Sequence, residues 1–269
     1  MPELPEVETT LRGLSPLITN KTVTRVNIYQ ENLRWKVPRH IPSTIKNCKV
    51  KGIERRGKYL LIRFDAGFLL MHLGMSGSIR VVNQSESLIK HDHFEICFDD
   101  KTCMRLNDPR RFGSVLFTRD GKHKLLSKLG VEPLSEEFDY YHLFKRSRNK
   151  TQNIKTFIMD SKVVVGVGNI YACESLYMSK INPKTQSGKV SHARYKLLTS
   201  SIKVVLSKAI DAGGTTLQDF AQVDGSPGYF SQTLSVYGRE GEKCNTCNGK
   251  ISRIVQNQRS TFYCTKCQN

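Results

Sequence analysis

Apolar positions spaced three and four residues apart open the chain and predict an N-terminal helix. The residues on its buried face are Leu4, Val7, Leu11 and Leu14. Pro5 suits the first turn, and Glu6 and Glu8 follow where acidic residues favour the positive end of the helix dipole. Gly13 and Pro16 predict its end. Such a helix would pin the N-terminus to a core.

From Lys21 to about Thr118 the pattern changes to period two, which is typical of β-strands. Tyr59 to Phe64 is apolar except for Arg63, and Asp99-Asp100-Lys101 predicts a hairpin turn. The other apolar runs are Val26 and Ile28, Phe68 to Leu73, Phe94, Ile96 and Phe98, Met104 and Leu106, and Val115 and Phe117. Several short strands separated by turns favour an antiparallel sandwich or barrel.

The second half of the chain has a helical pattern. Short helices are expected near 154–158 and 170–178, and a long one over 191–211 with Ser191 as its cap. The expected fold class is α+β, with an antiparallel β-sandwich preceded by a helix, a helical domain and a cysteine module. The expected boundaries are 1–125 for the β domain, 126–138 for a linker, 139–238 for the helical domain and 239–269 for the module.

Charge indicates the class of partner. The chain of 269 residues has 42 Lys and Arg against 24 Asp and Glu, a net charge of +18, and its pI is near 9.6. This surplus points to a polyanion, with nucleic acid ahead of a membrane surface. No apolar run approaches the ~20 residues of a spanning helix, and no signal peptide opens the chain, so a soluble intracellular protein is expected.

Four of the eight cysteines form two closely spaced pairs. Sixteen residues separate the Cys244/Cys247 pair from the Cys264/Cys267 pair, a spacing typical of a tetrahedral zinc site, with two disulfides as the alternative. Four thiolates leave no open position, so the zinc would be structural. A turn at Asn257-Gln258 predicts a β-hairpin that presents Arg259. The remaining cysteines are interpreted as small buried apolar residues outside any disulfide: Cys48, Cys97, Cys103 and Cys173.

The first residues offer an unusual nucleophile. An initiator Met before Pro is normally trimmed, so the mature chain is expected to begin at Pro2, whose α-amino group is a secondary amine. With a pKa of ~8, an α-amino group is partly neutral and nucleophilic at pH 7. Glu3 beside it could move protons, so the pair suits imine chemistry on a sugar carbon. Ordinary helix-start chemistry is the alternative.

Several loop sequences suit contacts to a nucleic acid. Gly166-Val167-Gly168-Asn169 precedes a predicted helix and suits a phosphate site, or a tight turn between helices. Lys58 stands in a basic turn that would contact phosphate or only solvent. Met75, Arg110 and Phe112 stand in glycine-flanked loops and suit wedges that enter a base stack, with buried structural positions as the alternative. His72 is interpreted as a packed core histidine.

Together these motifs resemble bacterial formamidopyrimidine-DNA glycosylase over essentially the whole chain. The matching segments are 2–8, 56–59, 72–77, 108–113, 166–171 and the cysteine tail with 258–264. The resemblance implies a helix–two-turn–helix domain, a zinc hairpin, and excision of 8-oxoguanine and formamidopyrimidines from duplex DNA. Strand cleavage by β,δ-elimination at the abasic site would follow.

The resemblance also implies roles for individual residues. Pro2 would attack C1′ and form an iminium, Glu3 would act as general acid and base with Glu6 in support, and Lys58 would bind phosphate beside the lesion. The expected DNA contacts are His91, Arg110, Lys155, Asn169 and Arg259. Met75, Arg110 and Phe112 would fill the space left by the flipped nucleotide, and loop 215–237 would cap the lesion.

The implied setting is a monomer with one structural zinc, acting on damaged duplex DNA in a bacterial cytoplasm, in association with the nucleoid. Three alternatives stay open: an endonuclease VIII-like glycosylase for oxidised pyrimidines, a noncatalytic zinc-ribbon DNA-binding protein, and a basic RNA-binding factor. Leu4 and the Arg110-Arg111-Phe112 run speak against the first. Intact Pro2, Glu3 and Lys58 speak against the second.

Overall fold

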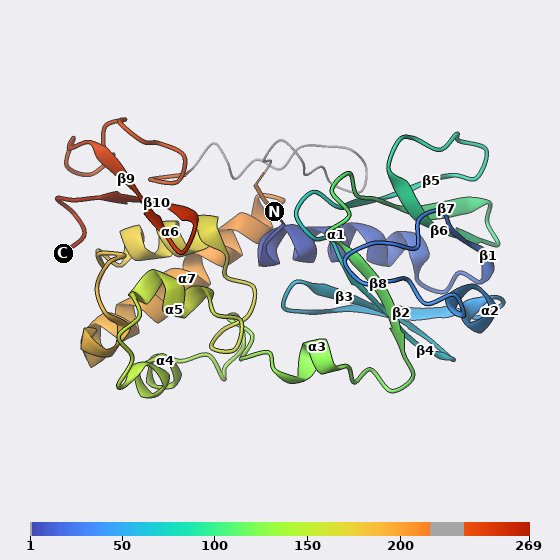
Figure 1. Ribbon diagram of the computed structural model, residues 1–269, viewed down its shortest axis with the longest axis horizontal. Helices are drawn as coiled ribbons and strands as arrows, with labels where there is room; N and C mark the ends of the chain where they lie inside the picture. Colours follow the sequence, from blue (N-terminus) through green and yellow to red (C-terminus); the bar gives the residue numbers. More distant parts are fainter. Residues whose placement is uncertain (1, 216–233) are drawn as a thin grey trace. The chain divides into compact units, whose positions relative to one another are not determined.

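The computed structural model describes residues 2–215 and 234–269, which form two compact units (Figure 1). The first unit comprises 2–127 with 212–215, and the second comprises 128–211 with 234–269. The loop expected at 215–237 lies, apart from its two ends, outside the described residues. Within the described part of the chain, no helix has the length and apolar character needed to cross a membrane.

The first unit contains two four-stranded antiparallel sheets, with strand orders β1-β6-β7-β5 and β2-β3-β4-β8. Its elements are α1 (Leu4–Ile18), β1 (Val23–Ile28), α2 (Ile41–Ile45), β2 (Val50–Arg56), β3 (Tyr59–Phe64), β4 (Gly67–His72), β5 (Ser78–Asn83), β6 (Asp92–Phe98), β7 (Thr102–Asn107), β8 (Ser114–Thr118) and α3 (Lys124–Ser127). One apolar core joins residues from both sheets with the buried face of α1. The predicted β-sandwich with an N-terminal helix is therefore confirmed.

Helix α1 is longer than the sequence predicts. It passes through Gly13 and Pro16 and ends at Ile18, so the predicted stop was wrong. Leu14 and Ile18 are fully buried in the core, and their packing outweighs the poor helix propensities of Gly13 and Pro16. Strands β2 and β5 were also missed, because their polar and half-exposed positions hide the strand alternation, and helix α2 was missed because it has only five residues.

Two connections between the sheets emerge at the same end of the sandwich. β4 and β8 pair at His72 and Ser114 in one sheet, while β5 and β7 pair at Ser78 and Asn107 in the other. Segment 73–77 therefore leads from the first of these sheets to the second, and segment 108–113 leads back beside it. These two segments, called here the crossovers, carry the candidate wedge residues.

The second unit combines helices with a C-terminal hairpin. Its elements are α4 (Tyr140–Ser147), α5 (Ile154–Met159), α6 (Asn169–Met178), the short 3₁₀ helix η1 (Ser187–Lys189), α7 (His192–Asp211), β9 (Ile251–Gln256) and β10 (Arg259–Cys264). Ser191 caps α7 as predicted, since its Oγ accepts from Arg194 N at 3.3 Å. Asn257 and Gln258 turn the hairpin with positive φ angles of 47° and 60°. Segment 128–138, predicted as linker, packs on this unit, where Val131 bridges Val164 and Phe138 is buried.

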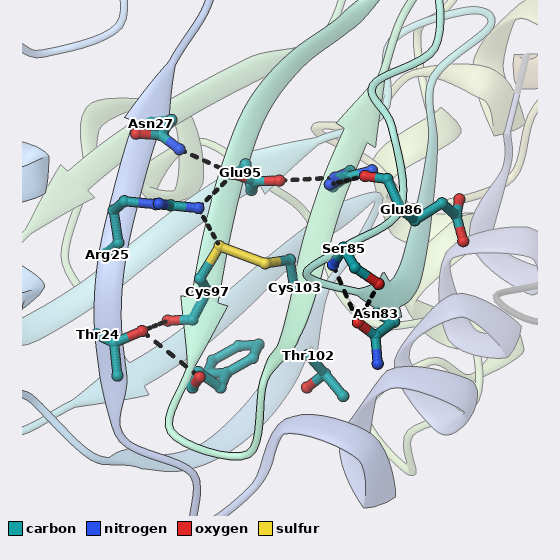
Figure 2. The surroundings of a disulfide bond; sticks show 12 residues. Thr24, Arg25, Asn27, Asn83, Ser85, Glu86, Glu95, Cys97, Thr102 and Cys103 are labelled. Atoms are coloured by element: carbon teal, nitrogen blue, oxygen red, sulfur yellow. Dashed lines mark hydrogen bonds and ion pairs between the residues drawn. A yellow bond between two sulfur atoms is a disulfide. The ribbon is translucent and has the colours of Figure 1, made fainter.

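A disulfide joins Cys97 to Cys103, so the interpretation of these two cysteines as unpaired apolar residues was wrong (Figure 2). The cause is the hairpin at 99–101, which makes Cys97 and Cys103 direct partners on β6 and β7 with a Cα–Cα distance of 4.1 Å. Arg25 lies beside the bond, with Nη2 3.6 Å from Cys97 Sγ. Cys173 is buried, as expected, whereas Cys48 is half-buried.

Candidate active site and DNA interface

The start of α1 is held by Glu6. One carboxylate oxygen of Glu6 accepts from the backbone N–H of Glu3 at 2.8 Å, and the other accepts from Thr215 N at 2.9 Å. Glu3 and Glu6 are each only 2% exposed. These bonds fix the backbone beside Pro2 and join it to the end of segment 212–215, within the first unit. A reactive group at this position would have a defined orientation.

Lys58 lies in the tight turn between β2 and β3, where Gly57 adopts a positive φ of 58°. The nearby residue Arg55 bonds Glu8 of α1 through Nε at 2.7 Å and the carbonyl of Gly57 at 3.0 Å. Glu8 and Arg55 are both largely buried, so this ion pair ties the Lys58 turn to the helix that begins at the N-terminus.

His72 has more than a packing role. Its Nδ1 accepts from Gly74 N at 2.9 Å, so the proton of the neutral ring lies on Nε2. Burial, together with the nearby cations Lys58 and Arg34, lowers the pKa of His72 from 6.5 to about 4. At neutral pH the ring is therefore an uncharged donor beside Lys58. No periodicity in the sequence could reveal this grouping, because strand pairing creates it.

The crossovers expose their large side chains. Phe112 is 43% exposed, Arg110 is exposed, and Met75 is half-buried. The guanidinium of Arg110 lies 5.0 Å from the centre of the Phe112 ring, a cation–π arrangement. The buried alternative for Phe112 is thus excluded. His91, a predicted DNA contact, is partly exposed on the neighbouring loop before β6.

In the second unit, Asn169 opens helix α6 directly after Gly168. Its side-chain amide donates to the carbonyl of Ser260 on β10 at 2.9 Å. Arg259, the residue before Ser260, is exposed. The structure therefore brings Asn169 and Arg259 to the same part of this unit, at a helix N-terminus whose partial positive charge favours an anion.

Lys155 is buried, with only 1% of its surface exposed. Its ammonium donates to Asn169 Oδ1 at 2.5 Å, to Thr261 Oγ1 at 2.7 Å and to the carbonyl of Ser260 at 3.1 Å. Through these bonds Lys155 supports both Asn169 and the zinc hairpin. Direct contact of Lys155 with DNA stays a prediction.

The four clustered cysteines fit one zinc ion. All four Sγ atoms lie within 4.8 Å of one another, and two of the separations are 3.8 Å (Cys244–Cys267) and 3.4 Å (Cys247–Cys264). A tetrahedron with Zn–S bonds of about 2.3 Å has edges of about 3.8 Å, so the thiolates match this geometry. Four protein ligands leave no position for substrate, which makes the zinc structural.

Glu174 is a further buried acid that the sequence did not reveal. It lies on α6, beyond Asn169, and accepts from the backbone N–H groups of Ser235, Val236 and Tyr237 at 2.8–2.9 Å. Burial raises the pKa of Glu174, and these three donors and Arg239 oppose that rise. Glu174 thus fixes the chain where segment 234–237 begins.

Three family models together match most of the chain. They are the formamidopyrimidine-DNA glycosylase N-terminal domain (1–115), its H2TH domain (129–221), and a zinc finger found in this glycosylase and in isoleucyl-tRNA synthetase (241–269). The formamidopyrimidine-DNA glycosylases of Ruthia magnifica and Alteromonas mediterranea are 64% and 51% identical to the chain, with 100% of each chain covered.

Solved structures agree with these relatives. The MutM (Fpg) protein of Thermus thermophilus is 34% identical with a TM-score of 0.90, covering 99% of this chain and 98% of that chain. A Lactococcus lactis Fpg, solved with DNA containing N7-benzyl-Fapy-dG, is 32% identical with a TM-score of 0.93 and full coverage of both chains. Fold and site thus define a zinc-finger DNA glycosylase of base excision repair. The chain belongs to the formamidopyrimidine-DNA glycosylase family.

Proposed function

We propose that this glycosylase removes oxidised purines from duplex DNA and then cleaves the strand at the resulting abasic site. The N-terminal proline amine attacks C1′ of the damaged nucleoside, the bond from C1′ to the base breaks, and the sugar opens to an iminium. A secondary amine gives an iminium that stays cationic, and this cation accepts electrons during β- and then δ-elimination of the phosphates. The reaction requires a chain that begins at Pro2.

Glu3 serves as the general acid and base of this scheme and protonates the sugar ring oxygen. Glu6 positions Glu3 through the hydrogen bond to its backbone N–H. Lys58 binds the phosphate next to the lesion, and the neutral ring of His72 lies beside it as a hydrogen-bond donor. A neutral ring avoids the repulsion that a second cation would meet beside Lys58.

Asn169 and Arg259 bind further phosphates from the second unit, and Met75, Arg110 and Phe112 occupy the space left by the extruded nucleotide. We place the residues that cap the lesion at 215–237. A monomer with one structural zinc suffices for this reaction, and the basic surface would keep the enzyme associated with the nucleoid in the bacterial cytoplasm. The proposed domains are 1–125, 139–238 and 239–269, joined by 126–138.

The observation that carries the proposal is the hydrogen bond from the backbone N–H of Glu3 to Glu6. This bond orients the backbone next to the amine in a chain that matches the family along its full length.

Borohydride trapping on a duplex with 8-oxoguanine opposite cytosine tests the proposal. We expect a covalent adduct with the native chain, and a loss of at least about 100-fold in Pro2→Gly and Glu3→Gln. Glu54→Gln, at an exposed acid on β2 of the same unit, is the control and should keep most activity. Absence of an adduct with both 8-oxoguanine and abasic DNA would refute the proposal.

Oxidised pyrimidines are the second substrate class to measure. A Lactococcus lactis Fpg has been solved with DNA containing an oxidised pyrimidine, so the family fold can hold such a base. We expect faster excision of 8-oxoguanine than of an oxidised pyrimidine under single-turnover conditions. The reverse order would favour the endonuclease VIII-like alternative.

A further inference from the structure

We propose that Asp108 is a positioning residue that holds the loops of Met75, Phe112 and His91 in one rigid arrangement for opening the base stack. This inference rests on the proposed function, which assigns the wedge role to these loops. Asp108 is fully buried (0% exposed) and directly follows β7. Its carboxylate, N–H and carbonyl together bond both crossovers, the loop at His91 and the start of β6.

The carboxylate of Asp108 joins the two crossovers. Oδ2 accepts at 2.7 Å from the N–H of Gly113, the residue after Phe112. Oδ1 accepts at 3.2 Å from the hydroxyl of Ser76, the residue after Met75. One oxygen thus serves each crossover. A carboxylate suits this position because both oxygens are acceptors.

Because the two crossovers pack closely through their backbones, their arrangement is sensitive to the hydrogen bonds of Asp108. A Cβ atom added at Gly74 would lie 2.4 Å from Gly113 N, and one added at Gly113 would lie 2.8 Å from the carbonyl oxygen of His72. The two crossovers therefore run in direct backbone contact. A shift of one crossover must move the other.

The backbone of Asp108 holds two strained residues. Its N–H donates to the carbonyl of His91 at 3.1 Å, and its own carbonyl accepts from Arg111 N at 3.1 Å and from His93 Nε2 at 3.0 Å. His91 and Arg111 adopt positive φ angles of 75° and 57°, which side chains other than glycine rarely occupy. Such conformations persist only where neighbouring structure fixes them, and they cluster at functional sites.

These contacts suit a rigid wedge. Extruding a nucleotide costs a few kcal/mol, and side chains held at a fixed position help to offset that cost as they enter the stack. The side chains of Arg110 and Phe112 are exposed, while the backbone that carries them is tied to buried Asp108. Loss of the tie would leave the chemistry at Pro2 intact and impair the step that opens the stack.

Three variants of the full, zinc-loaded chain test the proposal on two duplexes, one with 8-oxoguanine opposite cytosine and one with an abasic site. Asp108→Ala should slow 8-oxoguanine excision at least about tenfold, because small misplacement of positioned groups can cost up to ~100-fold. Cleavage of the abasic duplex, which has no base to extrude, should change less than about threefold. Asp108→Asn should restore most excision, because its oxygen can accept from Gly113 N–H and its NH₂ can donate to Ser76 Oγ.

Ser76→Ala removes one hydrogen bond of Asp108. Like Asp108→Ala, it should lower the rate of 8-oxoguanine excision relative to the rate of abasic-site cleavage. Glu95→Gln, a buried acid of the same sheet that pairs with Arg105 at 2.6 Å, is the matched control and should leave the ratio unchanged. Equal losses on both duplexes, no loss at all, or no rescue by Asp108→Asn would overturn the proposal. A native chain that forms no adduct on either duplex would instead refute the proposed function.

Discussion

Lys155 and Asn169 are joined by a hydrogen bond of 2.5 Å between the lysine Nζ and the asparagine Oδ1. The Asn169 oxygen accepts from the ammonium, and its NH₂ donates to the carbonyl of Ser260, which the same ammonium also contacts. The same ammonium bonds Thr261. A buried cation therefore sets the orientation of a candidate phosphate ligand and ties it to the zinc hairpin.

Replacing Lys155 by methionine should weaken DNA binding through Asn169. The change keeps most of the side chain's length and removes at least three hydrogen bonds from a buried site, so we expect the free energy of unfolding to fall by about 2–4 kcal/mol. Affinity for an abasic-site duplex should fall at least about tenfold at constant salt, because a misoriented amide loses its phosphate. Thermal unfolding and fluorescence anisotropy measure the two effects.

Lys150→Met is the matched control, since Lys150 is exposed in the same unit and its loss removes the same charge. We expect it to change stability by less than about 0.5 kcal/mol. If Lys150→Met and Lys155→Met weaken binding equally, charge alone explains the effect and the role assigned to Lys155 is wrong.

His72 should make the protein sensitive to acid. Its pKa is about 4 in the folded chain against 6.5 when unperturbed, so between these pH values the unfolded chain binds a proton that the folded chain does not. Stability therefore falls as pH drops below 6.5, and the loss ends near pH 4. At about 1.4 kcal/mol per pKa unit, the contribution reaches ~3 kcal/mol.

Denaturant unfolding at several pH values measures this contribution. His72→Asn should flatten the acid loss, because asparagine offers an oxygen to Gly74 N and does not titrate. His123→Asn is the control, since His123 Nδ1 accepts from Leu125 N at 3.2 Å in the same way. Identical acid slopes for the two variants would contradict the assignment to His72.

Removal of zinc should abolish tight DNA binding. The ion would hold β9 and β10 beside α6, and without it the clustered cysteines would take up protons and share no common ligand. Chelation, followed by a zinc assay and anisotropy, should show at least about tenfold weaker binding, restored by added zinc. Cys247→Ser should reproduce the loss, whereas Cys48→Ser, at a free cysteine of the first unit, should not. Unchanged binding after verified removal would show that the hairpin is dispensable.

Local patterns in the sequence were enough to predict much of the fold and part of the site. The cysteine spacing, the hairpin turn at Asn257 and the cap at Ser191 act between residues close in the chain, and each was confirmed. The Glu3–Glu6 contact lies within one helical turn. These features depend on short-range chemistry, which single-sequence reasoning treats well.

Contacts between distant strands and helices could not be read in this way. Tertiary pairing creates the hydrogen bond of Glu6 to Thr215, the burial of Lys155 and the hydrogen bonds of Asp108 to both crossovers. No periodicity in the sequence marks these contacts. The run to Ile18 in α1 shows the same limit, because packing overrode the stop signals. Residues that support a site are therefore harder to predict than residues that enter it.

The disulfide between Cys97 and Cys103 should determine how many cysteines can be alkylated before and after reduction. The turn at 99–101 was predicted, and extending its antiparallel register by one pair beyond Phe98 and Thr102 would have placed these cysteines opposite each other. Closing so short a loop should stabilise the fold by about 2 kcal/mol. Both cysteines are fully buried, so we expect the bond to resist mild reductants until the chain unfolds.

Alkylation of the unfolded, zinc-free chain should therefore modify six of the eight cysteines before reduction and all eight after it. Peptide mapping should assign the two late sites to Cys97 and Cys103. The double variant Cys97→Ala/Cys103→Ala should show eight minus two, or six, modified cysteines in both conditions, and a lower unfolding temperature than Cys48→Ala. Eight adducts on the native chain without reduction would show that the two thiols are not joined.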